Sequence, residues 1–434
     1  MRTCPPPMSG LHPQKQPFLV FADSEGKIYD LPDLFAMAKG ATGFILPPKE
    51  DFIPLPPGSE LFMLPQRHPV GLDPSGEAVT LRENPYGEGS AWAVAAFIAP
   101  AHTQLGIAAY EEEDGASPLP LFSYTAVGWS EGRFWVTAFR SDPDPRQDPD
   151  GFEMKKIRSK TLRRLRSHPH NRLLQHLGWR CCLTYGCPAA KNLFLSRYEA
   201  PLPTSPHCNA RCLGCISYQE GPIPVTQPRI EFVPTEEEIA EVAVPHLRKA
   251  SKAIVSFGQG CEGEPLLQAR RVEGAIRRIR SQTSRGTINL NSNASLPEEV
   301  GRLARAGLDS LRVTLPTARE RYYRAYVRPQ GFGLEEVRQS IRMMRGEGRF
   351  VSLNYFILPG FTDQEEEVEA LLEILGEGVD FIQLRNFNVD PLWFMRSVGF
   401  QTSREGIGIK GLIRRVKETF PQIGFGYFNP AVRG

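Results

Sequence analysis

The sequence contains little that would place the chain in or across a membrane. The apolar residues 91–101 are too few to span a bilayer, and they end beside His102. Residues 1–10 are rich in proline and lack the apolar core of a secretory signal. From the sequence we therefore expect neither export nor membrane insertion, and no membrane partner.

The chain also lacks a strong net charge and a disulfide pattern. Its 51 basic and 49 acidic residues leave a formal net charge of +2, which provides no overall field for a polyanion. A length of 434 residues, with 41% hydrophobic and 23% charged residues, predicts a globular protein of two or three domains. Eight cysteines in so long a chain, three of them closely spaced, are typical of reduced metal ligands and predict a cytoplasmic protein.

Residues 1–150 are dense in proline and glycine, and we expect them to form a β-rich N-terminal domain of unknown role. Strands are predicted at 18–21, 60–64 and 134–139, and turn residues lie between such runs at 23–26, 73–76 and 130–132. Closely spaced prolines at 141–145 mark the end of this domain.

Residues 151–190 are predicted to form a basic helical linker. Nine cations and no acidic residue lie in 154–180, whose apolar residues fit one side of one or two helices, broken near Pro169. The cations form either a solvated helix face, which we favour, or a surface that contacts the phosphates of RNA. Cys181, Cys182 and Cys187 follow at spacings of no standard zinc or ferredoxin pattern, so they are either ligands of a second iron-sulfur cluster or buried apolar side chains.

A cysteine loop follows, in which Cys208, Cys212 and Cys215 lie within eight residues. Three thiolates on a short loop can hold three irons of a 4Fe-4S cube and leave the fourth iron open, whereas a zinc site needs a fourth ligand, such as His207. This CxxxCxxC pattern resembles the cluster loop of the radical S-adenosylmethionine (SAM) enzymes, in which the open iron chelates the methionine end of SAM. The family usually has an aromatic residue before the last cysteine, where this chain has Gly214.

Beyond the loop, strands and helices alternate every 30 to 40 residues, which is typical of a parallel sheet. The predicted strands are 192–195, 253–257, 287–290, 310–315, 350–357 and 380–384. Capping boxes begin helices at Thr235, Ser295 and Thr362, and Gly307 and Gly376 end helices. The expected fold class is α/β, with a partial (β/α)6 TIM-type barrel over 191–395. In 396–434, a helix at 410–419 and an aromatic run at 425–428 either complete the barrel or dock on the N-terminal domain.

In such barrels the loops after the strands build the site. Glu262-Gly263-Glu264-Pro265 is similar to the GGEP motif of the family, whose backbone contacts the amino group of SAM. The resemblance extends over about 192–391, with Asn289 and further polar residues at the strand ends facing the barrel interior. It implies that the cofactor-binding residues are Gly260, Glu262, Gly263, Glu264, Asn291, Asn293, Arg312, Thr314, Asn354 and Gln383.

The resemblance implies an enzyme in which a reduced 4Fe-4S cluster cleaves SAM to a 5'-deoxyadenosyl radical, which abstracts hydrogen from substrate. The substrate is unidentified (a small molecule, a peptide or RNA), and the electron comes from a reductant such as flavodoxin or ferredoxin. Cys261 is a candidate catalytic hydrogen donor, a ligand of a second cluster, or a packed thiol. The alternative is a non-catalytic RNA-binding protein with zinc on Cys208, Cys212, Cys215 and His207.

Overall fold

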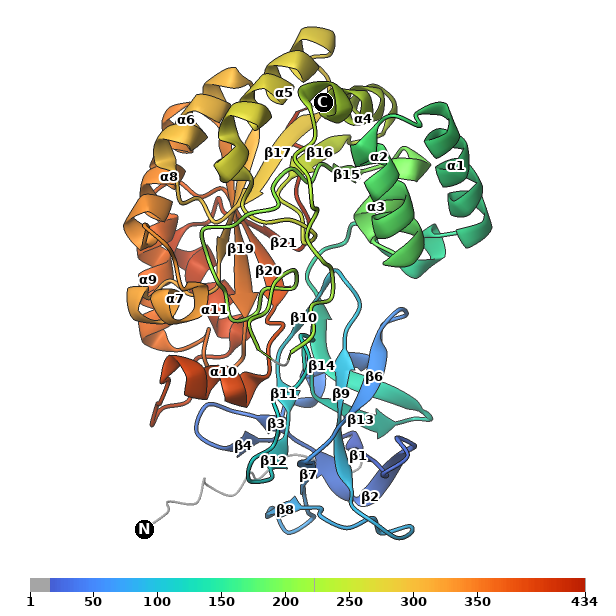
Figure 1. Ribbon diagram of the computed structural model, residues 1–434. Coiled ribbons are helices and arrows are strands. Elements are labelled where there is room, and N and C mark those ends of the chain that lie inside the picture. The colour runs from blue at the N-terminus through green and yellow to red at the C-terminus, as the bar shows by residue number, and fades with distance from the viewer. Residues whose placement is uncertain (1–15, 222, 434) are drawn as a thin grey trace.

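The chain folds into a β-rich domain, a small helical unit and a curled parallel sheet covered by helices (Figure 1). The computed structural model describes residues 16–221 and 223–433, so the proline-rich segment 1–10 lies outside the described residues. No helix within those described ranges combines the length and the apolar character needed to cross a bilayer. The expected α/β class with a separate β-rich N-terminal domain is confirmed.

The N-terminal domain is built of antiparallel strands in an eleven-stranded and a three-stranded sheet. The predicted strands at 18–21, 60–64 and 134–139 are confirmed, and turn residues join hairpin partners: Asp23 Oδ1 accepts the N–H groups of Glu25 and Lys27 at 2.9 and 3.0 Å. The strands are β1 Phe18–Ala22, β2 Ile28–Ala36, β3 Ala38–Lys39, β4 Phe44–Ile45, β5 Phe52–Pro54, β6 Glu60–Leu64, β7 Arg67–Leu72, β8 Ala78–Thr80, β9 Trp92–Phe97, β10 His102–Gln104, β11 Ile107–Ala108, β12 Tyr110–Glu112, β13 Val127–Ser130 and β14 Arg133–Arg140.

The helical unit that follows, green in Figure 1, lies beside the first strands of the parallel sheet. The prediction of helices broken near Pro169 is confirmed, because α1 ends at Ser167 and Asn171 caps the next helix by accepting the N–H of Leu174 at 2.7 Å. The unit consists of α1 Met154–Ser167, α2 Arg172–His176, a π-helix (η4) at Leu177–Thr184 and α3 Pro188–Leu195.

The parallel sheet has seven strands in sequence order, β15 to β21. Its last strand, β21, pairs with β20 in parallel, so the aromatic run at 425–428 extends the barrel sheet and does not join the N-terminal sheet. The strands are β15 Glu199–Pro201, β16 Ile254–Phe257, β17 Thr287–Ser292, β18 Ser310–Leu315, β19 Phe350–Ile357, β20 Phe381–Asn386 and β21 Gly424–Gly426. The helices are α4 Glu236–Lys249, α5 Ala269–Gln282, α6 Pro297–Ala306, α7 Glu320–Val327, α8 Leu334–Gly346, α9 Glu365–Leu375, α10 Pro391–Val398 and α11 Ile409–Thr419.

The first strand of the barrel was predicted wrongly. Residues 192–195 form the end of α3, which starts with Pro188 at its first position and buries Ala190, Leu193 and Phe194 at helical spacing. The first strand is instead the short β15, which pairs with β16. The helical unit therefore extends five residues beyond the predicted limit of 190.

Two of the three predicted capping boxes are also wrong. Thr235 and Glu238 form a capping box at α4. However, the Ser295 hydroxyl accepts a hydrogen bond from Asn209, and α6 starts at Pro297 without a side-chain cap. Thr362 Oγ1 bonds to the backbone of the preceding loop, and α9 starts at Glu365. Gly307 and Gly376 end helices as predicted, and Gly307 does so in the left-handed region at a φ of 116°.

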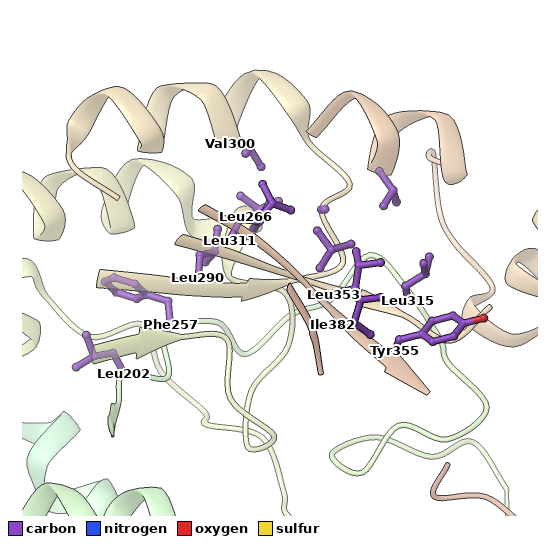
Figure 2. Close-up of a cluster of buried hydrophobic side chains, with 14 of the residues drawn as sticks. Leu202, Phe257, Leu266, Leu290, Val300, Leu311, Leu315, Leu353, Tyr355 and Ile382 are labelled. Atoms are coloured by element: carbon purple, nitrogen blue, oxygen red, sulfur yellow. The ribbon is translucent and has the colours of Figure 1, made fainter. Parts of the chain in front are cut away.

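The apolar core lies between the outer face of the parallel sheet and its helices. Figure 2 shows Phe257, Leu290 and Leu311 on this side, together with Leu353 and Ile382 of the later strands. These side chains are fully buried and come from successive strands. Because side chains alternate along a strand, the polar residues between them face the barrel interior.

The N-terminal domain docks at the carboxyl ends of β19 and β20. Gln104 Nε2 donates to the Ile357 carbonyl at 2.9 Å, and Thr103 Oγ1 donates to the Leu384 carbonyl at 3.1 Å. A buried guanidinium adds to this interface, because Arg67 is 1% exposed and lies 3.1 Å from the carboxylate of Asp390. The domain therefore covers the side of the barrel on which the loops after the strands lie.

Candidate functional site

The cysteine loop is the segment between β15 and α4, and its backbone is fixed to the end of α7. The N–H of Arg211 donates to the Val327 carbonyl at 3.0 Å, and the N–H of Leu213 donates to the Tyr326 carbonyl at 2.9 Å. Cys208, Cys212 and Cys215 are all half-buried. The loop therefore presents three thiols from a backbone that is hydrogen-bonded on both sides of Cys212.

These three thiols influence one another electrostatically. Burial raises the pKa of Cys212 well above its ordinary value, and the neighbouring Cys215 and Cys208 raise this pKa further. The pKa of Cys208 is raised to about 11, mainly by burial and secondly by the nearby carboxylate of Glu264. Thiolates that raise one another's pKa are unfavourable without a cation, so deprotonation of these thiols is coupled to metal binding.

Gly214 leaves no room for a side chain between the last two cysteines. A Cβ at this position would lie 2.4 Å from Tyr326 Oη and 2.4 Å from Val389 Cγ2. Tyr326 is a buried residue of α7 that packs edge-on against Phe356 and Phe394. The space beside Gly214 is therefore filled by an aromatic side chain that comes from α7.

The Glu262-Gly263-Glu264-Pro265 loop after β16 is bonded directly to the cysteine loop. The N–H of Gly263 donates to the Ser205 carbonyl at 2.7 Å, and the N–H of Glu264 donates to the His207 carbonyl at 2.8 Å. A Cβ on Gly263 would lie 1.9 Å from that His207 oxygen, so only glycine permits this approach. Gly260 packs on Ile216, where a Cβ would meet its Cδ1 at 2.6 Å.

The two carboxylates of this loop accept hydrogen bonds from protein groups. Glu262 accepts the N–H groups of Thr204, Ser205 and Gln259 at 2.7, 3.0 and 2.7 Å. Glu264 accepts from Ser292 Oγ at 2.6 Å and from the N–H of Asn293 at 2.8 Å. Burial raises the pKa of each carboxyl to about 7. These side chains hold the loops in place, and the backbone of the loop is the part that faces the cysteine loop.

The asparagines of the third-strand region connect the barrel interior to the cysteine loop. Asn289 Nδ2 donates to Asn291 Oδ1 at 2.8 Å, and Asn291 Nδ2 donates to the Gly258 carbonyl at 2.7 Å. Asn293 lies just beyond β17 and donates to Asn209 Oδ1 of the cysteine loop at 2.8 Å. Asn289 and Asn291 therefore share the interior face, as their alternation predicts, and Asn293 supports the cysteine loop.

Polar residues of β18 to β20 occupy the barrel interior in register. Thr314 lies opposite Asn354, and Asn354 lies opposite Gln383. Arg312 donates to Gln383 Oε1 at 3.2 Å. Burial lowers the pKa of Arg312 to about 10, and the nearby Arg385 lowers this pKa as well. Arg312 Nε and Asn354 Oδ1 are buried without a hydrogen-bond partner among the described residues. The interior thus holds a cation and an amide oxygen with unused hydrogen-bonding capacity.

Sequence reasoning did not identify several residues of the site. Arg229 comes from the irregular segment before α4, and its guanidinium lies 3.7 Å from Cys215 Sγ. Asn429, near the C-terminus, bonds to Gln383 and to Glu199 at 2.8 and 2.7 Å. No spacing pattern marks these residues in the sequence, because long-range folding alone brings them to the barrel.

A surface pocket of about 290 Å³ adjoins the cysteine loop. Cys212 lines it, and it is bordered by Pro118 of the N-terminal domain and Trp393 of α10. An opening of this size beside the cysteines gives a small molecule or a side chain of a partner access to the loop.

The upstream cysteines lie in two different places. Cys181 Sγ is 3.9 Å from Cys261 Sγ, and Cys187 lines the same small cavity as these two thiols. Cys182 Sγ instead lies 3.5 Å from Thr161 Oγ1 in the helical unit. The predicted set of Cys181, Cys182 and Cys187 is therefore not gathered at one point, and the second cluster stays a prediction.

The cations of residues 154–180 mostly lie on the exposed side of α1, and the others lie at the start of α2 and within η4. Arg172 forms an ion pair with Glu238 at 2.8 Å, and Arg164 is half-buried against α4. The choice between a solvated helix face and a phosphate-contacting surface stays a prediction, which salt-dependent filter binding of RNA would test.

The geometry defines a parallel α/β barrel with a three-cysteine loop bonded to a glycine-containing loop at the carboxyl ends of its strands. Residues 202–372 match the family described as the Radical SAM superfamily. Residues 202–372 are therefore a radical SAM domain. No curated protein matches the chain.

Three solved structures are similar to part of the chain at low identity. Methylornithine synthase (PylB) is 16% identical over 56% of this chain and 68% of that chain, with a TM-score of 0.38. HydG, a maturase of the [FeFe]-hydrogenase, is 17% identical over 64% and 66%, with a TM-score of 0.39. A radical SAM methyltransferase from Sphaerobacter thermophilus is 18% identical over 53% and 65%, with a TM-score of 0.36. The matches span about two thirds of each of these relatives.

The zinc alternative receives no support from the arrangement of the cysteine loop. His207 is exposed. Among residues 16–221 and 223–433, the one group of three or more potential ligands close enough for a single ion is His176, Cys181 and Cys261. Cys208, Cys212, Cys215 and His207 do not form such a group, so their ligand atoms are too far apart for one zinc ion.

Proposed function

We propose that this protein is a radical SAM enzyme that holds a 4Fe-4S cluster on Cys208, Cys212 and Cys215 and abstracts a hydrogen atom from its substrate. The observation that carries the proposal is the direct bonding of the cysteine loop to the loop after β16. Gly263 and Glu264 reach Ser205 and His207 through the backbone. This bonding brings the expected cluster site and the expected SAM site against each other.

The residues present fit the cluster and SAM. Three half-buried thiols without a fourth protein ligand in their loop suit a cube with one open iron. In the barrel interior, Arg312 has a buried Nε without a partner, and Asn354 has a buried Oδ1 without one, among the described residues. A guanidinium suits the carboxylate of SAM, and an amide oxygen suits a hydroxyl or an ammonium.

A reduced cluster held by Cys208, Cys212 and Cys215 would supply the one-electron chemistry that cleaves SAM reductively. The protein positions SAM and excludes water from the site. Glu262 and Glu264 fix the loop after β16 by accepting backbone N–H groups. Gln104 and Thr103 hold the N-terminal domain over the carboxyl ends of β19 and β20, which shields this side of the barrel.

The substrate and the electron donor reach the site from outside. We propose that a one-electron reductant of the flavodoxin or ferredoxin type, in the cytoplasm, approaches the cysteine loop. The pocket that Cys212 shares with Pro118 and Trp393 is the candidate entrance for a small molecule, a peptide or a nucleotide side group. Because this pocket includes the N-terminal domain, we expect that domain to contribute to substrate selection.

The test is iron quantification and electron paramagnetic resonance on anaerobically reconstituted protein. We expect about four irons at the cysteine loop and a reduced signal that changes when SAM is added, because SAM binds the open iron. Cys212→Ala should lose both the brown colour and the signal. Cys182→Ser is the matched control, since Cys182 is buried but lies beside Thr161, away from the loop. A Cys212→Ala variant with the signal of the wild type would overturn the assignment.

A further inference from the structure

A second group of metal-ligand side chains lies behind the loop that follows β16. The ligand atoms of His176, Cys181 and Cys261 all lie within 4.8 Å of one another. They come from α2, from η4 and from the loop after β16, so residues about 80 positions apart in the chain meet at one point. Both thiols are buried, with Cys181 at 3% and Cys261 at 5% exposure.

The winding of the helical unit places His176 and Cys181 on the same side. In an α-helix with 3.6 residues per turn, positions five apart point about 140° away from each other. Residues Leu177–Thr184, directly after His176, form a π-helix, whose wider turn brings positions five apart closer to the same side than an α-helix does. Such π-helical segments are rare and occur frequently at functional sites. The local backbone therefore supports a shared ligand role for the two side chains.

Two further observations point to a ligand at this place. His176 Nε2 is buried and has no hydrogen-bond partner among the described residues. A cavity of about 30 Å³ is lined by Cys181, Cys187 and Cys261, which is enough space for a water-sized occupant. The N–H of Cys187 donates to the Cys181 carbonyl at 2.8 Å, which fixes the backbone of Cys187 at the edge of this cavity.

The distances distinguish a single ion from a second cluster. In a tetrahedral zinc site with Zn–S bonds of about 2.3 Å, two sulfurs lie about 3.8 Å apart. The Cys181 and Cys261 sulfurs are 3.9 Å apart. Thiolates around an iron-sulfur cube lie farther apart, since each binds a different iron and points away from the centre of the cube. The spacing and the small cavity therefore match one ion.

We propose that His176, Cys181 and Cys261 bind one zinc ion, separate from the cluster on the cysteine loop, and that Cys187, which lines the same cavity but lies outside this group of three, completes the ligand set. Thiolates with one imidazole form a common closed, structural zinc set. Cys261 directly precedes Glu262, whose carboxylate holds the backbone of Thr204 and Ser205. The ion thus ties the helical unit to the loop that supports the cysteine loop. In this role Cys261 is a metal ligand and not a hydrogen donor.

Zinc quantification and zinc X-ray absorption spectroscopy on the full-length wild-type protein test the proposal. After desalting, we expect about one zinc per chain, with sulfur neighbours near 2.3 Å and nitrogen near 2.0 Å. An absence of zinc, or a shell made of oxygen neighbours, would overturn the proposal. So would about eight irons per chain, of which half disappear when Cys181 is replaced, because that result indicates a second cluster.

Variants locate the ion independently of the proposed catalytic function. Cys181→Ser, Cys187→Ser and Cys261→Ser should each lower zinc from about one per chain toward zero. Cys182→Ser is the matched control and should retain zinc, because its thiol lies beside Thr161. Equal zinc loss in Cys182→Ser would overturn the assignment. Protein that retains zinc but neither binds iron nor responds to SAM would contradict the proposed function and leave the zinc site standing.

Discussion

Replacing Gly214 by alanine tests how tightly the cysteine loop is packed. The new Cβ would lie 2.4 Å from Tyr326 Oη and from Val389 Cγ2. Carbon atoms in contact are normally about 3.5 to 4.0 Å apart, so the added methyl is more than about 1 Å too close on two sides. Tyr326 is buried among Phe356, Phe387 and Phe394 and has little room to retreat. The substitution must therefore move the loop.

The expected cost is that of overpacking a buried site, about 1 to 3 kcal/mol. If this whole free-energy cost is added to the barrier for SAM cleavage, because the three cysteines are displaced, the rate of cleavage falls by about 5-fold to 150-fold. We expect a parallel loss of bound iron. The assay measures both quantities on reconstituted Gly214→Ala protein, together with its free energy of unfolding.

Two further variants make this result specific. Tyr326→Phe combined with Val389→Ala removes both atoms that the new Cβ would meet, so the triple variant should regain iron and activity relative to Gly214→Ala. Gly346→Ala is the control, because a Cβ there meets no atom within 4 Å. The reasoning is refuted if Gly214→Ala keeps the iron content and SAM cleavage of the wild type.

Three more predictions concern the interface, the buried histidine and the barrel interior. Asp390→Ala leaves the buried Arg67 with Glu112 as its remaining carboxylate partner, and we expect a loss of about 3 kcal/mol in denaturant unfolding. Glu111→Ala removes the exposed Arg82–Glu111 ion pair and should lower the free energy of unfolding by less than about 1 kcal/mol. Equal losses in Asp390→Ala and Glu111→Ala would contradict the role of the buried Arg67–Asp390 pair in stability.

Burial lowers the pKa of His246 from 6.5 to about 4, so the unfolded chain takes up this proton first as the pH falls. The stability that this group contributes is present above pH 6.5 and declines toward pH 4, by up to about 3 kcal/mol. The difference in unfolding free energy between wild type and His246→Gln should therefore decline as the pH falls from 6.5 to 4. Arg312→Gln should weaken SAM binding by about 10-fold to 100-fold in equilibrium titrations, through the loss of a charge-assisted hydrogen bond. Unchanged affinity would remove Arg312 from the SAM site.

Strong local patterns in the sequence predicted the central barrel strands well. β18 and β19 have the predicted bounds, because each is a run of β-branched and apolar residues that ends in turn residues or glycine. The first strand was missed because residues 192–195 are equally apolar, and a proline at the start of α3 favours the helix. β15 has only three residues, and its pairing with β16 is a long-range contact that no local pattern records.

Local sequence patterns predict the cysteines and glycines of the candidate site, whereas no local pattern predicts its supporting contacts. The spacing of Cys208, Cys212 and Cys215 predicts a metal-binding loop, and their role as ligands stays a prediction. The roles of Glu262 and Glu264 depend on which buried N–H groups lack other partners, and that is decided by packing. The meeting of Cys181 with Cys261 depends on the docking of the helical unit against the barrel.

The most direct test of the radical SAM function is the formation of 5'-deoxyadenosine from SAM by the anaerobically reconstituted and chemically reduced protein. We expect the wild type and the Cys182→Ser control to produce it, and Cys212→Ala to produce none. Absence of 5'-deoxyadenosine from a wild-type protein that carries about four irons at the loop, or equal formation by Cys212→Ala, would contradict the proposed function.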